Sequence, residues 1–161
     1  SPYTSIHSKV TNDLYYPVSG GHISVFVNEN YVGQSSIPTV GRGESFDLYL
    51  GIDEEIRVKR PELTDKKKKS LLGLRTRKDF AYKIEIENYK NEAARVAVYD
   101  QLPVSKNNDI KAELVSSTVK PSETKDLGIL KWNFELTPKE KKSFEFEFFV
   151  EHPSDKQVSG I

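Results

Sequence analysis

A basic stretch between Arg57 and Lys78 is the part of the sequence with the greatest capacity for ligand binding. It holds ten Lys or Arg residues and two acidic residues. Such a stretch attracts polyanions, for example nucleic acid, anionic glycans or lipid headgroups, or the acidic remainder of a second copy. It has no aromatic residue for stacking on bases, and most charge runs are solvated loops. The ten residues are Arg57, Lys59, Arg60, Lys66, Lys67, Lys68, Lys69, Arg75, Arg77 and Lys78.

The segment Asp100–Pro103 is the second candidate for chemistry. Asp100 and Asp109 could be paired carboxylates that bind a metal ion or act as acid and base. No series of regularly spaced oxygen ligands follows Asp109, however. In the structural interpretation Asp100 accepts backbone N–H bonds across a turn, Leu102 fills the core and Pro103 ends a strand. We expect this structural role for Asp100, Gln101, Leu102 and Pro103.

Residues for other catalytic chemistry are scarce. His7, His22 and His152 lack the spacing of metal ligands. The chain has no Cys, which excludes disulfides, thiolate catalysis and Cys-ligated zinc. It also has no nucleophile elbow, phosphate loop or dinucleotide fingerprint. We expect no catalytic residue, metal site or cofactor; the alternative, a hydrolase, would need carboxylates or a His–carboxylate pair converging in a pocket.

β-Strands must position these residues, because alternation of apolar and polar residues dominates the sequence. No segment has a convincing helical period, and parallel strands would need crossover helices, so antiparallel sheets are predicted. Turn residues separate strands at intervals typical of a sandwich. The predicted fold class is all-β: an antiparallel immunoglobulin-like β-sandwich with a smaller N-terminal β subdomain. The strongest alternating runs are Phe80–Ile86, Ala94–Val98, Ile110–Leu114, Leu130–Leu136 and Phe144–Val150.

Length and composition agree with this organisation. The 161 residues carry 24 basic and 24 acidic side chains, and 36% are hydrophobic, enough for a modest core. No apolar run approaches the roughly 20 residues of a membrane span, so no transmembrane segment is predicted. We predict an N-terminal β subdomain over residues 1–60, a basic connecting segment over residues 61–79, and the sandwich over residues 80–161. Within the connecting segment, Leu71, Leu72 and Leu74 could form a short edge strand. His22–Val27 and Tyr31–Gly33 are predicted to form a hairpin around the Asn-rich turn at residues 28–30.

The aromatic residues divide into core and surface by their phase. Trp132 is in phase with Leu130, Phe134 and Leu136, so it is predicted to anchor the core. Phe149 breaks the phase of its strand and is expected to pack between subdomains or mark an interface. Four tyrosines are out of phase or near strand ends and are expected to be exposed, where they could stack on sugars: Tyr15, Tyr16, Tyr49 and Tyr99.

Several segments together resemble a known family. They are Gly20–Val27, Tyr31–Gly33, Ser36-Ile37, Gly51–Arg60, Asn88, Asp100–Ser105, Gly128–Trp132, Pro153 and Ser159-Gly160, of which Asp100–Ser105 is the most specific. They resemble the C-terminal domain of the mucoidy-inhibitor A family, a domain of unknown function. The resemblance implies a C-terminal module of a longer protein, with an N-terminal β domain and a coiled coil before it. It brings no catalytic residue with it, and its link to exopolysaccharide points only loosely to the cell envelope.

The sequence therefore predicts a non-catalytic protein-interaction or scaffold module. Its partner would be another protein or a second copy of itself, bound through an edge strand or the basic segment. The alternative is polyanion or carbohydrate binding through residues 57–78 and the exposed tyrosines. The compartment, cytoplasmic or cell envelope, stays open.

Overall fold

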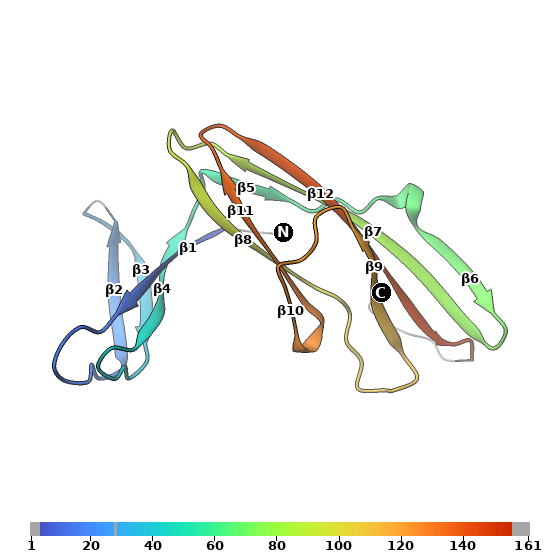
Figure 1. The fold of residues 1–161 in the computed structure, drawn as a ribbon, viewed down its shortest axis with the longest axis horizontal. Helices are drawn as coiled ribbons and strands as arrows, with labels where there is room; N and C mark the ends of the chain where they lie inside the picture. The colour runs from blue at the N-terminus through green and yellow to red at the C-terminus, as the bar shows by residue number, and fades with distance from the viewer. Residues whose placement is uncertain (1–3, 28, 156–161) are drawn as a thin grey trace. The chain divides into compact units, whose positions relative to one another are not determined.

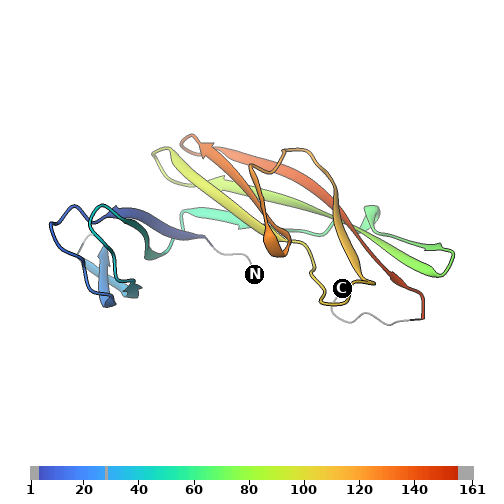
Figure 2. The same ribbon diagram turned by 60° about the horizontal axis from the view of Figure 1, so that its bottom comes forward.

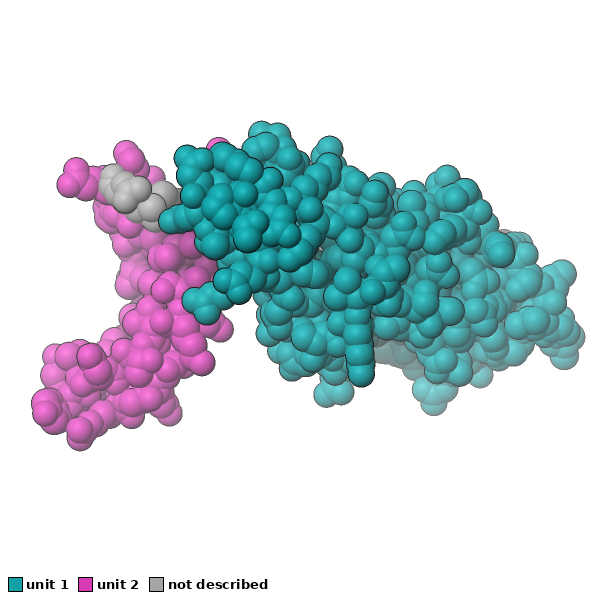
Figure 3. All heavy atoms as spheres, turned by 45° about the horizontal axis from the view of Figure 1, so that its top comes forward, with its two compact units in different colours: residues 1–2, 56–161 teal, residues 3–55 magenta. Residues whose placement is uncertain are grey.

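A computed structural model describes residues 4–27 and 29–155 of the chain. Apart from short turns, these residues form antiparallel β-strands, as the alternation predicts (Figure 1). They belong to two compact units, one of residues 3–55 and a larger one that contains residues 56–161, coloured separately in Figure 3. The predicted all-β, antiparallel fold class is confirmed; the finer immunoglobulin-like topology stays a prediction.

The smaller unit consists of two strand pairs. β1 (Ser5–Thr11) pairs with β4 (Ser45–Ile52), and β2 (Gly21–Val27) pairs with β3 (Asn30–Ile37). The β2–β3 hairpin is the predicted one, although Asn28 of its turn lies outside the described residues. β1 is a strand that the sequence analysis missed, because only Ile6 and Val10 mark its alternation. Buried Asn12 joins its loops by donating to the carbonyl oxygens of three other residues: Tyr16, Val40 and Gly41.

The larger unit is a sandwich of two antiparallel sheets. One sheet has the order β5-β7-β12-β9, with β6 also paired to β7, and the other has the order β10-β11-β8. Two single 3-10 turns, η1 (Thr64–Lys66) and η2 (Asp126–Gly128), join strands. The strands are β5 (Ile56–Lys59), β6 (Lys68–Leu72), β7 (Arg75–Asn88), β8 (Ala94–Gln101), β9 (Lys111–Ser117), β10 (Glu123–Lys125), β11 (Ile129–Leu136) and β12 (Lys141–Pro153).

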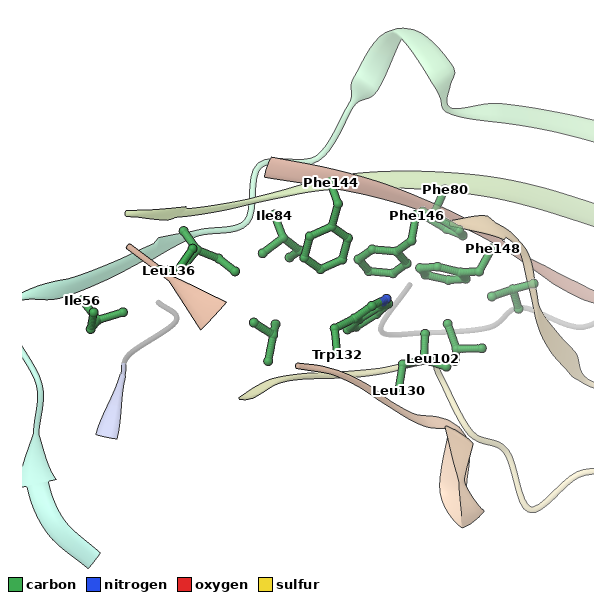
Figure 4. Close-up of a cluster of buried hydrophobic side chains, with 13 residues drawn as sticks. Ile56, Phe80, Ile84, Leu102, Leu130, Trp132, Leu136, Phe144, Phe146 and Phe148 are labelled. Carbon is green, nitrogen blue, oxygen red and sulfur yellow. The ribbon is translucent and has the colours of Figure 1, made fainter. Parts of the chain in front are cut away.

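An aromatic row on β12 fills the space between the two sheets (Figure 4). Phe144, Phe146 and Phe148 point to the same side because side chains alternate along a strand. The Trp132 ring of the opposite sheet lies 4.9 Å from the Phe144 ring and 5.6 Å from the Phe146 ring, between centroids. Trp132 is 1% exposed, so its prediction as a core anchor is confirmed.

The basic segment is where the observed organisation differs most from the predicted one. The boundary between the units falls between Glu55 and Ile56, because β5 pairs with β7 and so belongs to the sandwich. Residues 61–79 also lie in the larger unit. β7 begins at Arg75, before the alternation at Phe80 becomes visible, and its first residues pair with β6. Residues that were predicted to connect two subdomains therefore form a β-hairpin of one of them.

Buried Asn88 at the end of β7 organises one end of the sandwich. Its side chain is 0% exposed. Its amide nitrogen donates to the carbonyl oxygens of Glu92 at 2.9 Å and Thr137 at 3.0 Å, and its Oδ1 accepts the N–H of Lys90. One side chain thus joins the β7–β8 turn to the β11–β12 turn, and these bonds satisfy the buried amide of Asn88 itself.

We expect Asn88→Ala to lower the free energy of unfolding by about 1–3 kcal/mol, because the two turns lose the hydrogen bonds that join them. The matched control is Asn133→Ala. Asn133 is exposed and its amide bonds only to Ser122 Oγ, so a change within about 0.5 kcal/mol is expected. Urea unfolding followed by circular dichroism measures both values, and equal losses would contradict the role given to Asn88.

Candidate functional site

The ion pair between Arg60 and Asp100 is the most elaborate polar arrangement in the sandwich. Arg60 Nε lies 2.6 Å from Asp100 Oδ2, and Arg60 Nη2 lies 3.2 Å from Oδ1, so the pair is bidentate. The guanidinium carbon lies 3.6 Å from the centroid of the Tyr82 ring. Arg60 directly follows β5 in one sheet and Asp100 lies on β8 in the other, so the pair joins the two layers.

Burial and charge act in opposite directions on Arg60. Burial disfavours the charged guanidinium, but the hydrogen bond and charge of Asp100 outweigh it and raise the pKa of Arg60 above its ordinary value. Arg60 is therefore a permanent cation held by a partner within the domain. The sequence analysis grouped Arg60 with the polyanion-binding residues. Its position in the alternation could have shown otherwise, because residues 56, 58 and 60 share the inner face of the strand.

The other residues of the Asp100–Pro103 motif also have structural contacts. Oδ1 of Asp100 accepts the N–H of Gln101, whose side chain donates to the Leu127 carbonyl oxygen. Leu102 is buried in the core, and Pro103 follows the end of β8. The predicted bonds of Asp100 to backbone N–H groups across the turn are corrected in one respect: its second partner is the Arg60 side chain, from a different strand. Trp132 Nε1 donates to the Val119 carbonyl oxygen at 2.8 Å.

The predicted metal ligands and histidines lie apart from one another in the described ranges. Over residues 4–27 and 29–155, no three His, Cys, Asp or Glu side chains gather as metal ligands. Asp109 is exposed, in the loop before β9. His7 bonds Ser5 Oγ, His22 is exposed, and buried His152 bonds the Pro153 carbonyl oxygen through Nδ1.

The ten basic residues do not form one patch. Arg57, Lys59 and Arg60 lie on or next to β5, Lys66 and Lys67 at η1, and the other five on β6 and β7.

Most of these cations have a partner within the sandwich. Lys66 Nζ donates hydrogen bonds to the carboxylates of Glu145 and Glu147, which raise the pKa of Lys66. The remaining pairs are Lys67 with Glu62, Arg75 with Glu151, Arg77 with Asp79, and Arg57 stacked on Tyr89. Four lysines, Lys59, Lys68, Lys69 and Lys78, make no ion pair or side-chain hydrogen bond with another described residue. The region that remains open to an anion is therefore narrower than the sequence predicted.

The surface aromatics lie largely as expected. Tyr15, Tyr16, Tyr49 and Tyr99 are all exposed, but they come from separate elements of two units. Phe149 is 9% exposed and lies beneath Arg77, whose guanidinium carbon is 4.0 Å from its ring centroid. Side chains of its own sheet cover Phe149, so its change of phase reflects an amphipathic outer face.

β8 has an open edge. The sequence analysis predicted binding through an edge strand but did not say which strand. β8 ends the three-stranded sheet, and its eight residues pair with β11 without a shift in register. Leu102 N–H donates to the carbonyl oxygen of Gly128 directly opposite. Because bonding alternates along an antiparallel pair, Asp100 and Val98 also face β11. Tyr99, Ala97 and Arg95 therefore direct their backbone N–H and C=O groups away from β11.

In a comparison with protein families, the domain of unknown function DUF4139 matches residues 6–154. The chain belongs to the DUF4139 family. This agrees with the resemblance to the mucoidy-inhibitor C-terminal domain at the level of the domain. The residues Ser159-Gly160 that contributed to that resemblance lie outside the described residues. The description of the DUF4139 family names no activity.

A curated relative of this DUF4139 chain is "Protein F37C4.5" of Caenorhabditis elegans. It is 22% identical over 160 residues, which cover 91% of this chain and 29% of the relative. The chain thus spans less than a third of the length of that protein. No solved structure matches the chain. Among the described residues, no helix has the length and apolar character needed to cross a bilayer.

We expect the Arg60–Asp100 pair to show a coupling free energy of about 1–2 kcal/mol in a double-mutant cycle of Arg60→Met and Asp100→Asn. The pair is bidentate and Asp100 is 11% exposed, so Arg60→Met leaves a poorly solvated carboxylate. The control is Lys111–Glu113 at 3.0 Å, with both side chains more than half exposed, for which at most about 0.5 kcal/mol is expected. Urea unfolding of the seven proteins, the wild type and three variants for each pair, measures both couplings, and equal couplings would contradict the bridging role of Arg60.

Proposed function

We propose that this DUF4139 domain is a non-catalytic protein-interaction module that binds its partner by adding a strand to the open edge of β8. The observation that carries the proposal is the outward direction of the backbone groups at Arg95, Ala97 and Tyr99. Unpaired N–H and C=O groups on a sheet edge are a template for another strand. In such complexes main-chain bonds provide affinity, and alternate side chains provide specificity.

The other sheet edges of the sandwich are less suited to strand addition. β5, β6 and β10 have only four, five and three residues. β9 has seven residues, but its pairing with β12 has a shift in register, and an ion pair between Lys111 and Glu113 lies on it. Charge and irregularity are ways in which proteins protect edges. β8 pairs with β11 without a shift in register and contains no Pro. Its outer face carries one charged side chain, Arg95.

Side chains along β8 indicate the kind of strand that would fit. Tyr99 is 57% exposed, with Lys131 Nζ 5.6 Å from its ring centroid, and Ala97 leaves space beside it. An aromatic or β-branched residue of the partner, placed opposite Ala97, would make the cross-strand contacts that stabilise sheets. The short match to a much longer relative supports a module carried by a larger protein, and a place within the mucoidy-inhibitor subgroup is part of this proposal.

The test is a pull-down from lysate of the source cells with the wild type, Ala97→Pro and Ala97→Val, at about 50 mM and about 300 mM salt. Ala97→Pro removes an outward N–H donor without removing a β11 hydrogen bond, and edge strands tolerate Pro. Ala97→Val keeps the donor. We expect a protein retained at both salt concentrations by the wild type and Ala97→Val, and at least about tenfold less of it with Ala97→Pro.

A crosslinker at Tyr99 should join the same protein, and urea unfolding should show both Ala97 variants folded. Equal retention by the two variants would contradict strand addition at β8.

A further inference from the structure

The hairpin of β6 and the first residues of β7 is a protruding element that the strand-addition proposal does not use. We call residues 68–78 the basic hairpin. A two-residue loop, Gly73-Leu74, joins its strands, and Gly73 has φ of +62°, a conformation that favours glycine. Figures 1 and 2 show that the basic hairpin extends beyond the three-stranded sheet. Accordingly, every residue of β6 is exposed.

Three leucines surround the tip of the basic hairpin. Leu71, Leu72 and Leu74 are 72%, 51% and 89% exposed. Leu71 and Leu72 are consecutive strand residues, so they point to opposite faces, and Leu74 lies in the loop. A flat partner would cover only one of these faces. An apolar medium that can close around a tip would cover all three side chains.

A group of free cations lies behind the leucines. Lys68, Lys69 and Lys78 make no ion pair with a described residue. Lys68 is directly opposite Asp79, whose carboxylate pairs with Arg77, and Lys69 is directly opposite Lys78 in the strand pairing. Like charges in directly opposite positions repel, so the pair Lys69 and Lys78 does not stabilise the fold. It lies three residue pairs behind Leu72–Arg75, about 10 Å at 3.3 Å per residue. Long lysine stems can extend further toward the tip.

Apolar side chains at the tip with cations behind them match the layers of a bilayer surface, where acyl chains lie below charged headgroups. Apolar side chains of interfacial proteins lie about 5–10 Å below the headgroup boundary, and basic residues contact anionic headgroups above them. Nucleic acid fits less well, because residues 68–78 contain no aromatic side chain for base stacking. An acidic protein would match the lysines but leave the leucines in water.

We infer that the basic hairpin is a peripheral membrane anchor for anionic bilayers. Leu71, Leu72 and Leu74 insert into the interfacial layer, and Lys68, Lys69 and Lys78 contact phosphate and carboxylate groups of the lipids. Apolar insertion together with basic charge supplies the two contributions that stable peripheral association needs. The anchor is separate from the β8 edge, so it does not depend on strand addition.

The first test is sedimentation of the chain with vesicles of phosphatidylcholine alone or with about 30% phosphatidylserine, at about 100 mM salt. We expect binding to the anionic vesicles only. Changing Leu71, Leu72 and Leu74 together to Ser, or Lys68, Lys69 and Lys78 together to Glu, should each lower the partition coefficient at least about tenfold.

Matched controls change the same chemistry elsewhere on the larger unit. Val104, Val115 and Leu127, all exposed, are changed together to Ser, and Lys106, Lys120 and Lys141, also exposed, to Glu. The second set changes the net charge as much as the hairpin set does. Both controls should keep most of the binding, and circular dichroism should show that all four variants fold.

A second experiment measures insertion of the basic hairpin into the bilayer in a variant that keeps all three leucines. The chain has no Cys, so Ser70→Cys can carry an environment-sensitive fluorophore at a single site on β6. Its emission should shift to the blue on anionic vesicles, whereas the same label at Asn133→Cys should not shift.

Three outcomes would overturn the inference: no preference for anionic vesicles, equal losses in hairpin and control variants, or binding that survives the Leu→Ser changes without a shift at residue 70. The last outcome would indicate adsorption to any polyanion, or docking to an acidic protein. Ala97→Pro should bind vesicles like the wild type, and the Leu→Ser variant should still retain the protein partner. The failure of either proposal is thus separable from the failure of the other.

Discussion

The packing of the β12 aromatic row against Trp132 is the constraint on which the sandwich depends. β12 is central in its sheet, and it pairs with β7 over thirteen residues and with β9 on its other side. A slip of one residue would turn Phe144, Phe146 and Phe148 to the outside and the glutamates between them to the core. Burial of the aromatic row therefore determines the register of β7, and through β7 the positions of β5 and β6.

Polar side chains complete the sandwich where apolar packing ends. Asn88 joins two turns at one end, and Arg60 joins the sheets by its pair with Asp100 and its contact with Tyr82. Each stabilises the fold because buried polar groups that lose their partners carry the full cost of desolvation. The most specific motif of the sequence thus has a structural contact, in which Asp100 orients the guanidinium of Arg60.

Both proposed surfaces follow from the unequal size of the two sheets. The three-stranded sheet ends at β8, whose outer backbone groups have no neighbouring strand among the described residues. The longer sheet extends past the three-stranded sheet, and every residue of β6 at this end is exposed. A strand edge offers directional hydrogen bonds, whereas an apolar tip with free lysines offers insertion and charge. The two surfaces are therefore suited to different partners and respond differently to salt.

The sequence by itself determined the class of fold and the inward side of most strands. Alternation is local, and each residue such as Trp132 or Leu102 carries its own hydrophobicity, so its phase reveals which face is buried. Tertiary structure alone decided which distant segments meet. The Arg60–Asp100 pair joins residues 40 positions apart, and β6 was recognised as part of the sandwich only by its pairing with β7. Charge in a sequence does not reveal whether a counter-ion lies across the sheet, so the structure was needed to separate paired arginines from free lysines.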